Sequence, residues 1–518
     1  MAGALSVSIS LYKLIGGIMI DNVVIVAGGK NSRFKEMSIF PKLLLPINAK
    51  ESILTHDTSI FHDKQIYVLI NQDYYDMVCD YVANLNLNVK VVKSTNTNGS
   101  FGSIYAAKDK LPAFSTLYVW SDLILSREDV DNFEKRVESE KPDYAFGTYA
   151  LDYRLGVDEN GKLDSGRHNL PGIYYTFNFP THPKTNESGE TDLAEVIAAC
   201  DGDKKAFEWT GPISEFRDKK TFLDYYRSPA QYAPTPRFFN QISVSGSTVI
   251  KKCVNHAYDD LLMNENTWYE AINNAGIADI APKVYRYSRK DGLIEMEYID
   301  GEPVYKAMNC VNYLDIMEKI EQSLAKLHAV KSSTIRKEDF VAAARTELVD
   351  KPIFRCNKIK HMLISYDEKE LYSLILKAWD WLSNHLDMVP CLCHGDLNME
   401  NMLYTKDGEV KFLDPRGYFG NLIAYGSKDY DNAKVLYGLS GYDKFNNENY
   451  IYYSQGVYDK PEDRTWIAPT DLNTKMNRII VATIWISLTS YIGQDIYKAN
   501  IAMEHGLALL KAALAEKD

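Results

Sequence analysis

The segment between residues 391 and 417 constrains the fold more than any other part of the chain. Residues 394–401 read HGDLNMEN and residues 412–417 read FLDPRG. An aspartate and an asparagine five residues apart, followed by an aspartate at the end of an apolar strand, form the set that phosphoryl transfer to a hydroxyl requires. We expect Asp396 to orient the attacking hydroxyl, with deprotonation as a further role, and Asn401 and Asp414 to hold Mg²⁺ on the phosphates of ATP.

The length of the chain, 518 residues, indicates two or three domains. Before a proline-rich stretch at 226–237 (YRSPAQYAPTPR), apolar strands alternate with helices, which is typical of an α/β sheet covered on both faces. After it, antiparallel strands at 242–253 and 292–299 flank a helix near 264–274, and from residue 311 onward the chain is mostly helical. We therefore expect two domains, 1–233 and 234–518.

A glycine-rich turn follows the first apolar strand, Asn22–Ala27. It begins with Gly28 and Gly29, and Arg33 and Lys42 come soon after it. Such a turn exposes backbone N–H groups that can cradle phosphates, and the two cations would neutralise a triphosphate. The alternative is an ordinary strand–helix turn with solvated basic residues. Asp122, at the end of the strand-like run 117–122 (LYVWSD), is a candidate Mg²⁺ ligand or a simple turn cap.

The turn resembles the signature loop of the nucleotide-diphospho-sugar pyrophosphorylase and cytidylyltransferase superfamily, with Asn31 where glycine is usual. Residues 96–105 (NTNGSFGSIY) resemble the segment of phosphocholine cytidylyltransferases that faces the nucleotide base. The resemblance implies a Rossmann-like nucleotidyltransferase domain with a mixed, mostly parallel sheet, and Mg²⁺ bound by Asp122. Ser214 stands where a second acid is expected, so Glu215 or Asp218 would substitute. The nucleotide-binding residues implied are Gly28, Gly29, Ser32, Asn98, Ser100 and Ser103.

His-Gly-Asp at 394–396, in place of His-Arg-Asp, resembles the aminoglycoside phosphotransferase and choline/ethanolamine kinase superfamily. The resemblance covers nearly all of residues 240–518 and implies a two-lobed α+β fold like that of protein kinases. Lys251, or the adjacent Lys252, would reach the α- and β-phosphates of ATP and pair with Glu265. The segment containing Glu297 and Ile299 would contact adenine. Leu324–His328 matches a Leu-x-x-Leu-His helix of the superfamily and Asp431 its late structural aspartate, whereas the loop 243–247 (SVSGS) has a single glycine.

Together the two resemblances imply a bifunctional enzyme. A kinase would phosphorylate a small alcohol such as choline, ethanolamine or a similar compound. A nucleotidyltransferase would then join the phosphate to a nucleotide, with CTP as the expected donor. The product would be a CDP-activated alcohol for surface-polysaccharide decoration. Several aromatic residues could cage a quaternary ammonium, namely Trp466, Trp485, Tyr491 and the cluster Tyr450–Tyr453. However, Val481, Trp485, Leu488 and Ile492 have the spacing of a buried helix face. A sugar or polyol substrate, and a catalytically inactive N-terminal domain, remain alternatives, while an antibiotic phosphotransferase would leave the N-terminal domain without a purpose.

Composition narrows the possible partners. The formal net charge of -12 opposes binding to nucleic acid or anionic lipid. Seven scattered cysteines without zinc-ligand spacing favour buried, reduced thiols, Cys391 and Cys393 included. No signal peptide or membrane span is expected, so the cytoplasm is the predicted location, with small molecules and nucleotides as the partners. Met19 is a candidate start, and the sequence gives no oligomeric state.

Overall fold

The computed structural model describes residues 19–29, 38–48, 51–95, 98–150, 153, 155–181, 190–216, 219–226, 240–255 and 259–517. The chain divides into two compact units, Met1–Gln231 with Gly493–Ile496, and Tyr232–Ile492 with Tyr497–Asp518. The domain boundary expected at 233 lies in the segment 227–239, outside the described residues. Among the helices of the described residues, none combines the length and the apolar character that crossing a membrane requires.

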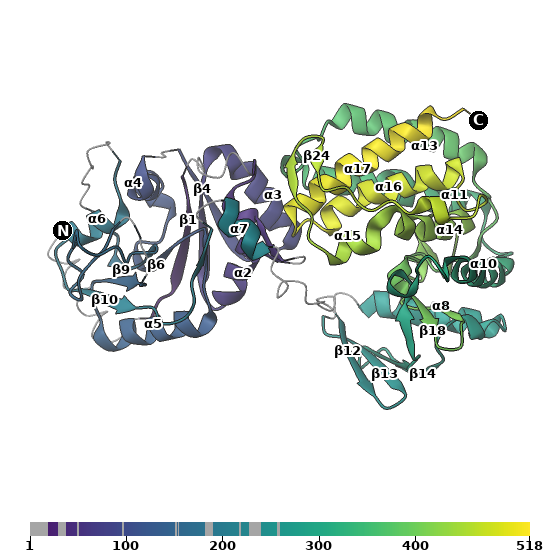
Figure 1. Ribbon diagram of the computed structural model, residues 1–518, viewed down its shortest axis with the longest axis horizontal. Helices are drawn as coiled ribbons and strands as arrows, with labels where there is room; N and C mark the ends of the chain where they lie inside the picture. Colours follow the sequence, from purple (N-terminus) through teal and green to yellow (C-terminus); the bar gives the residue numbers. More distant parts are fainter. Residues whose placement is uncertain are drawn as a thin grey trace. The chain divides into compact units, whose positions relative to one another are not determined.

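The N-terminal unit contains a seven-stranded sheet with the order β10-β8-β9-β6-β1-β4-β5 (Figure 1). The strands are β1 (Asn22–Ala27), β4 (Gln65–Asn71), β5 (Val89–Ser94), β6 (Phe114–Trp120), β8 (Tyr144–Thr148), β9 (Ile173–Asn178) and β10 (Lys204–Glu208). β1 pairs in parallel with both β4 and β6, whereas β9 runs antiparallel to β6 and β8. The sheet is therefore mixed and mostly parallel, as the sequence predicted.

Helices cover both faces of this sheet, which explains why β1 is a continuous apolar run. Val24 and Val26 pack against α4 (Gly99–Ala106) and α6 (Leu193–Ala199). On the opposite face, Val23 and Ile25 are fully buried, and α5 (Arg127–Glu140) packs Phe133 edge-on against a phenylalanine of β10. Helices α2 (Ile53–Ile60), α3 (Tyr75–Leu85) and α7 (Lys219–Tyr226) complete the described helices of the unit.

Chain order places a topological switch next to β1. The chain runs from β1 to its neighbour β4 and on to β5, and then returns to β6 on the other side of β1. In open α/β sheets, ligands bind outside the carboxyl ends of the strands at such a switch. Gly28 follows β1 and Asp122 follows β6, so both predicted residues lie at this edge.

The C-terminal unit begins with a four-stranded antiparallel sheet of order β12-β13-β15-β14. Its strands are β12 (Asn240–Ser245), β13 (Thr248–Cys253), β14 (Val284–Ser288) and β15 (Leu293–Glu297), and α8 (Asp259–Asn274) follows β13. The predicted strands and helix are confirmed, although α8 begins five residues before the predicted start at 264.

The remainder of this unit is mainly helical. Its longer helices are α10 (Tyr313–Ala329), α11 (Lys337–Arg345), α12 (Lys351–Lys358), α13 (Glu368–His385), α14 (Lys428–Tyr437), α16 (Lys475–Tyr491) and α17 (Ile496–Ala515). The segment with the HGDLNMEN motif interrupts them with β17 (Cys391–Leu392), β18 (Met402–Thr405) and β19 (Val410–Phe412). Cys391 and Cys393 are buried, as expected, whereas the expectation of burial is wrong for Cys310, which is exposed.

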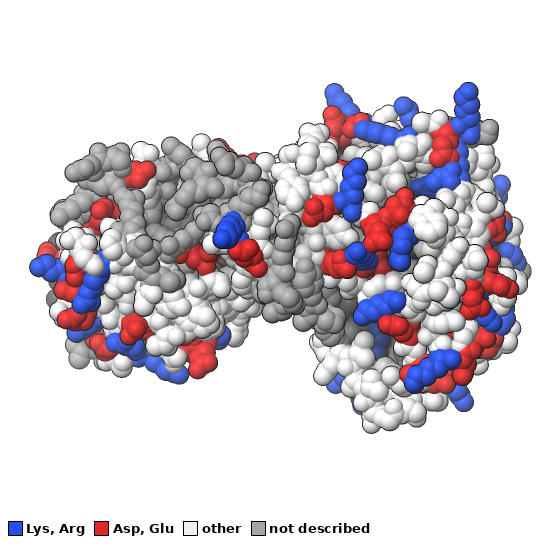
Figure 2. Space-filling model, viewed as in Figure 1, with Lys and Arg blue, Asp and Glu red and all other residues white. Residues whose placement is uncertain are grey.

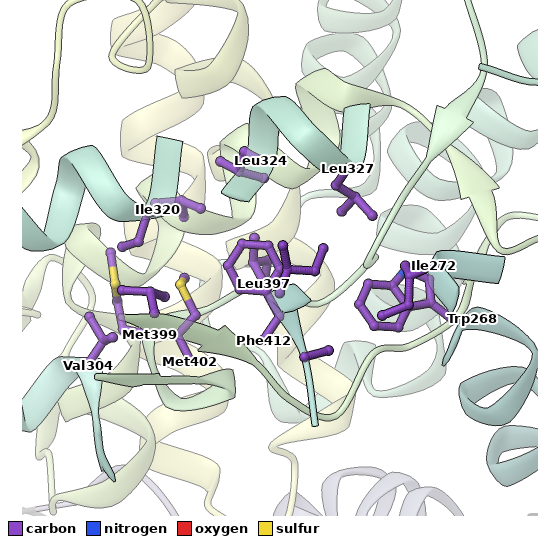
Figure 3. Packing of buried hydrophobic residues seen from close by; sticks show 14 of the residues in the cluster. Trp268, Ile272, Val304, Ile320, Leu324, Leu327, Leu397, Met399, Met402 and Phe412 are labelled. Carbon is purple, nitrogen blue, oxygen red and sulfur yellow. The ribbon is translucent and has the colours of Figure 1, made fainter. Parts of the chain in front are cut away.

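Apolar residues of the motif loop are part of a hydrophobic core (Figure 3). Leu397 and Met399 are buried and belong to one cluster with Ile320 and Leu324 of α10 and with Trp268 of α8. Because Leu397 and Met399 are anchored in this core, the loop that carries Asp396 and Asn401 has a defined position between the strands and the helices.

Candidate active sites

In the C-terminal unit, three predicted residues from distant parts of the sequence meet. Lys251 of β13 is buried, and its Nζ lies 2.7 Å from Oε2 of Glu265 in α8 and pairs directly with the carboxylate of Asp414. These two carboxylates raise the pKa of Lys251 against the opposing effect of burial, so the lysine stays cationic. Lys252 is exposed. Strand alternation thus selects Lys251 as the residue that faces the site.

Asp396 and Asn401 form a second pair at the motif loop. The Nδ2 group of Asn401 donates to the backbone oxygen of Asp396 at 2.7 Å and to its Oδ2 at 3.4 Å. The backbone N–H of Leu413 donates to the backbone oxygen of Asn401 at 2.8 Å. This bond joins the pair to the segment that carries Asp414. Asp414 itself has a φ of 56°, a left-handed conformation that is costly for a non-glycine residue and is concentrated at functional sites.

Asp431 binds the backbone of this loop. Its two oxygens accept the backbone N–H groups of His394 and Gly395, each at 2.8 Å, and its Oδ2 lies 3.3 Å from Nε2 of His328. Burial would raise the pKa of the Asp431 carboxyl, but the hydrogen bond and charge of His328 outweigh it and the pKa is lowered. The His394 ring is buried, and Nε2 lies 2.9 Å from the backbone oxygen of Leu413. Asp431 and His394 therefore hold together both halves of the motif.

The donor set fits a magnesium ion that is shared with nucleotide phosphates. Asn401 and Asp414 offer oxygen ligands, which Mg²⁺ prefers, and Mg²⁺ is commonly bound by one or two protein oxygens plus phosphates and water. Within the described residues, no group of three or more histidine, cysteine, aspartate or glutamate side chains gathers as an all-protein cage.

The predicted adenine segment lies at the end of β15. The backbone N–H of Glu297 donates to Lys283 at 2.9 Å, and the next N–H, of Tyr298, donates to Ser247 at 2.8 Å. Both amides are thus used within the sheet. Ile299 follows the strand and is half-buried.

Sequence reasoning missed one residue that contacts Asp396. Lys434 of α14 is largely buried, and its Nζ lies 2.9 Å from Oδ1 of Asp396. It follows Asp431 by three residues, so it projects from the same side of the helix. The spacing points to Lys434 only once the structure shows that Asp431 holds the motif loop.

Of the aromatic residues considered as a cation cage, Trp485 and Tyr450 both pack against Phe445, whereas Trp466 and Tyr491 have other partners. Trp485 is fully buried and donates its indole N–H to Ser440 at 2.9 Å. Trp466 is 75% exposed and lies near Tyr313, whereas the ring of Tyr491 lies beneath the guanidinium of Arg355. The alternative interpretation of 481–492 as a buried helix face is confirmed by the burial of Val481, Trp485, Leu488 and Ile492.

In the N-terminal unit, Lys42 and Asp122 meet at the carboxyl edge of the sheet. The Nζ of Lys42 lies 2.8 Å from Oδ2 of Asp122 and 2.9 Å from the backbone oxygen of Phe216. Glu215 is adjacent, since β11 (Ser214–Glu215) pairs antiparallel with β7 (Leu123–Ile124), with Glu215 opposite Leu123. Lys42 and Asp122 thus form an ion pair at this edge, and the backbone of Glu215 lies in the adjacent strand. Ser32, Arg33 and Asp218 lie outside the described residues.

The predicted base-facing segment packs against the glycine turn. A Cβ atom at Gly28 would lie 2.6 Å from Cβ and Oγ of Ser103, so only glycine permits this approach of α4 to the turn. Ser100 has a structural use, because its Oγ accepts the N–H of Leu193 at the start of α6 at 2.9 Å. Asn98 immediately precedes α4, and its backbone oxygen accepts the N–H of Thr191 at 3.3 Å.

These features define a kinase-like C-terminal unit and a Rossmann-like N-terminal unit. Residues 234–414 match the family described as "Phosphotransferase enzyme family" (APH), over less than half of the chain. No curated protein matches the chain in sequence.

Solved structures similar to the chain fall into two groups. Choline kinase LicA from Streptococcus pneumoniae shares 15% identity, covering 54% of this chain and 92% of its own, with a TM-score of 0.33. The inositol-1-phosphate CTP transferase from T. maritima shares 13%, covering 40% and 92%, with a TM-score of 0.33. HddC from Yersinia pseudotuberculosis shares 19%, covering 40% and 97%, with a TM-score of 0.32.

Proposed function

We propose that the chain is a bifunctional enzyme whose C-terminal unit transfers the γ-phosphoryl group of ATP to a small alcohol. The observation that carries this proposal is the contact of Lys251 with both Glu265 and Asp414. Three elements separated in sequence converge there on the cation and carboxylates that an ATP–Mg²⁺ complex needs. Asp396, which is hydrogen-bonded to Asn401, adds the carboxylate that would orient the acceptor hydroxyl.

In the kinase step, an oxygen of the acceptor hydroxyl attacks the γ-phosphorus, the bond to the β–γ bridging oxygen breaks, and ADP leaves. Asp396 orients the hydroxyl and accepts its proton, while Lys434 holds the Asp396 carboxylate in place. Lys251 contacts the α- and β-phosphates. Asn401 and Asp414 would hold Mg²⁺, which when bound neutralises negative charge on the phosphates.

We further propose that the N-terminal unit uses the phosphorylated alcohol as its nucleophile. A phosphate oxygen attacks the α-phosphorus of a nucleoside triphosphate, and pyrophosphate leaves. Positioning and charge neutralisation suffice for this reaction, so no protein nucleophile is needed. The ion pair of Lys42 and Asp122 at the carboxyl edge of the sheet supports this role. CTP is the proposed nucleotide, and the product would be a CDP-activated alcohol that serves surface-polysaccharide decoration.

Two classes of alcohol enter this scheme. One is choline, ethanolamine or a similar amino-alcohol, and the other is a sugar or polyol. The separate environments of Trp466, Trp485 and Tyr491 weaken the first class, because these side chains do not share a cage for a quaternary ammonium. The second class needs no such cage.

Paired variants test the two-site proposal. With ATP, a nucleotide and an alcohol, Asp396→Asn should abolish ADP formation and leave pyrophosphate release from pre-phosphorylated alcohol intact. Asp122→Asn should do the reverse. Loss of both activities in either variant, with folding retained by circular dichroism, would refute the separation of the sites. Intact kinase activity with no pyrophosphate release from any of CTP, UTP or GTP would instead support an inactive N-terminal domain.

A further inference from the structure

An excess of positive charge lies beside the motif loop. The buried carboxylate of Glu347 accepts two hydrogen bonds from the Arg416 guanidinium, one of them at 2.9 Å, and lies 2.7 Å from Nζ of Lys351. Arg355 follows Lys351 by four residues in α12, so it extends the same helix face. Within the part of the chain that the structure describes, Glu347 is the one carboxylate that these three cations share.

This cationic cluster, defined as Lys351, Arg355 and Arg416, adjoins the residue that would receive the acceptor hydroxyl. The Arg416 backbone N–H donates to the oxygen of His394 at 2.9 Å. A Cβ atom built on Gly395 would lie 3.2 Å from Cβ of Arg416, so the Arg416 side chain runs along the loop next to Asp396. Asp396 itself is paired with Lys434.

The surroundings of the cluster leave its charge incompletely compensated. Arg355 donates to the backbone oxygen of Ser487 at 2.8 Å and lies over the ring of Tyr491, and neither partner carries a negative charge. Burial, and then the charge of Arg416, lower the pKa of Lys351 to about 7 despite its contact with Glu347. Half-buried cations that outnumber their carboxylates are costly unless an anion joins them. Lys351 retains 21% of its side-chain exposure, so a ligand can reach it.

We propose that the acceptor of the kinase is an alcohol that also carries a carboxylate or phosphate group, and that Lys351 and Arg355 bind this anion while the hydroxyl reaches Asp396. The inference rests on the proposed kinase function and specifies its substrate class. A quaternary ammonium would meet like charge at the same place, and a neutral polyol would leave the cluster uncompensated. On this basis choline is disfavoured as the acceptor.

A matched acceptor series tests the substrate class. The full-length protein is assayed for ADP formation with glycerol, D-glycerate and glycerol 3-phosphate, and with ethanolamine and choline. We expect one of the two anionic compounds to have the highest kcat/KM, and the comparison between them separates a carboxylate from a phosphate. A higher kcat/KM for choline, ethanolamine or glycerol would overturn the inference while leaving the kinase proposal intact.

A binding measurement decides the inference even without turnover. Calorimetry with inorganic phosphate, with the nucleotide site saturated by a non-hydrolysable ATP analogue and Mg²⁺, should show binding that weakens by about 10- to 100-fold in Lys351→Met and in Arg355→Met. Lys377→Met, which removes an exposed lysine of α13, is the matched control and should bind like the unchanged protein. Equal binding by all four proteins, or none, refutes the anion site. Failure of the kinase proposal would instead appear as absence of ADP formation with every acceptor.

Discussion

Replacing Asp431 by asparagine removes one of the two oxygens that hold the motif loop. Each oxygen accepts a different backbone N–H at 2.8 Å, and the residue is fully buried. In Asp431→Asn, an NH₂ group must face either the N–H of His394 or that of Gly395. A lost hydrogen bond to a charged acceptor costs about 1.5–3 kcal/mol, and the unsatisfied N–H adds about 1–3 kcal/mol. We therefore expect a loss of roughly 3–5 kcal/mol in the free energy of unfolding of the C-terminal unit.

Urea unfolding followed by tryptophan fluorescence measures this loss, since Trp268 stacks edge-on against His394 at 5.3 Å between ring centroids. Asp429→Asn is the matched control. Asp429 lies two residues earlier in α14 and is also buried, but burial raises its pKa, so neutralising it should cost little. The single N–H that it is seen to accept, from Asp387 at 2.9 Å, can be kept by an asparagine oxygen. A loss below about 1 kcal/mol in Asp431→Asn, or an equal loss in both variants, would refute the reasoning.

Asp431 also predicts a pH effect, and two further changes concern the N-terminal unit. Because folding lowers the pKa of Asp431, its stabilisation is complete above the ordinary value of 3.8 and is lost as the pH falls below it, which urea midpoints between pH 3 and 6 would record. Burial raises the pKa of Asp57 to about 8, so the folded unit holds a proton that the unfolded chain has lost. Its stability should fall as pH rises from 4 to 8, and Asp57→Asn should flatten that dependence; a steeper one contradicts it. Gly28→Ala should lower pyrophosphate release through its clash with Ser103 while ADP formation persists, and Ser103→Gly in the same chain should restore it.

Much of the fold follows from local sequence patterns. The apolar run Asn22–Ala27 predicts β1 with its observed bounds, because a strand buried on both faces must be apolar throughout. Helix ends were less predictable. Helix α4, for example, begins at Gly99, which has a φ of 78°, and is followed by a separate 3-10 turn at Lys108–Lys110. The left-handed start depends on the close approach of Thr191, a long-range contact.

Some residues of the candidate sites were predicted from the sequence and others were not. Lys251 and Glu265 were predicted from a family pattern, and their contact follows from that pattern's geometry. The partners of Asp396 and Arg416, namely Lys434 and Glu347, were not predicted, because each pair joins segments more than 35 residues apart that only tertiary packing brings together. Glu347 also lies in a π-helical turn, Thr346–Asp350, between α11 and α12. Such turns have no clear sequence pattern and are frequent at functional sites.

The acidic overall charge has a local counterpart on the surface. On the face of the C-terminal unit visible in Figure 2, acidic and basic side chains are interspersed among the residues that are coloured. That face therefore offers no extended basic surface for a polyanion within the described residues, in line with the net charge of -12. The cations of functional interest instead lie beside the motif loop, where they can act on a small molecule.

The central claim is that one unit makes the phosphate that the other unit consumes, and isotope tracing tests it most directly. The protein is supplied with ATP carrying ¹⁸O in its γ-phosphoryl group, unlabelled CTP and the alcohol that supports the fastest ADP formation. Mass spectrometry of the nucleotide-linked product should find the label in the phosphate next to the alcohol, and the released pyrophosphate should be unlabelled. A product without the label, or labelled product formed equally well by Asp396→Asn, would contradict the account.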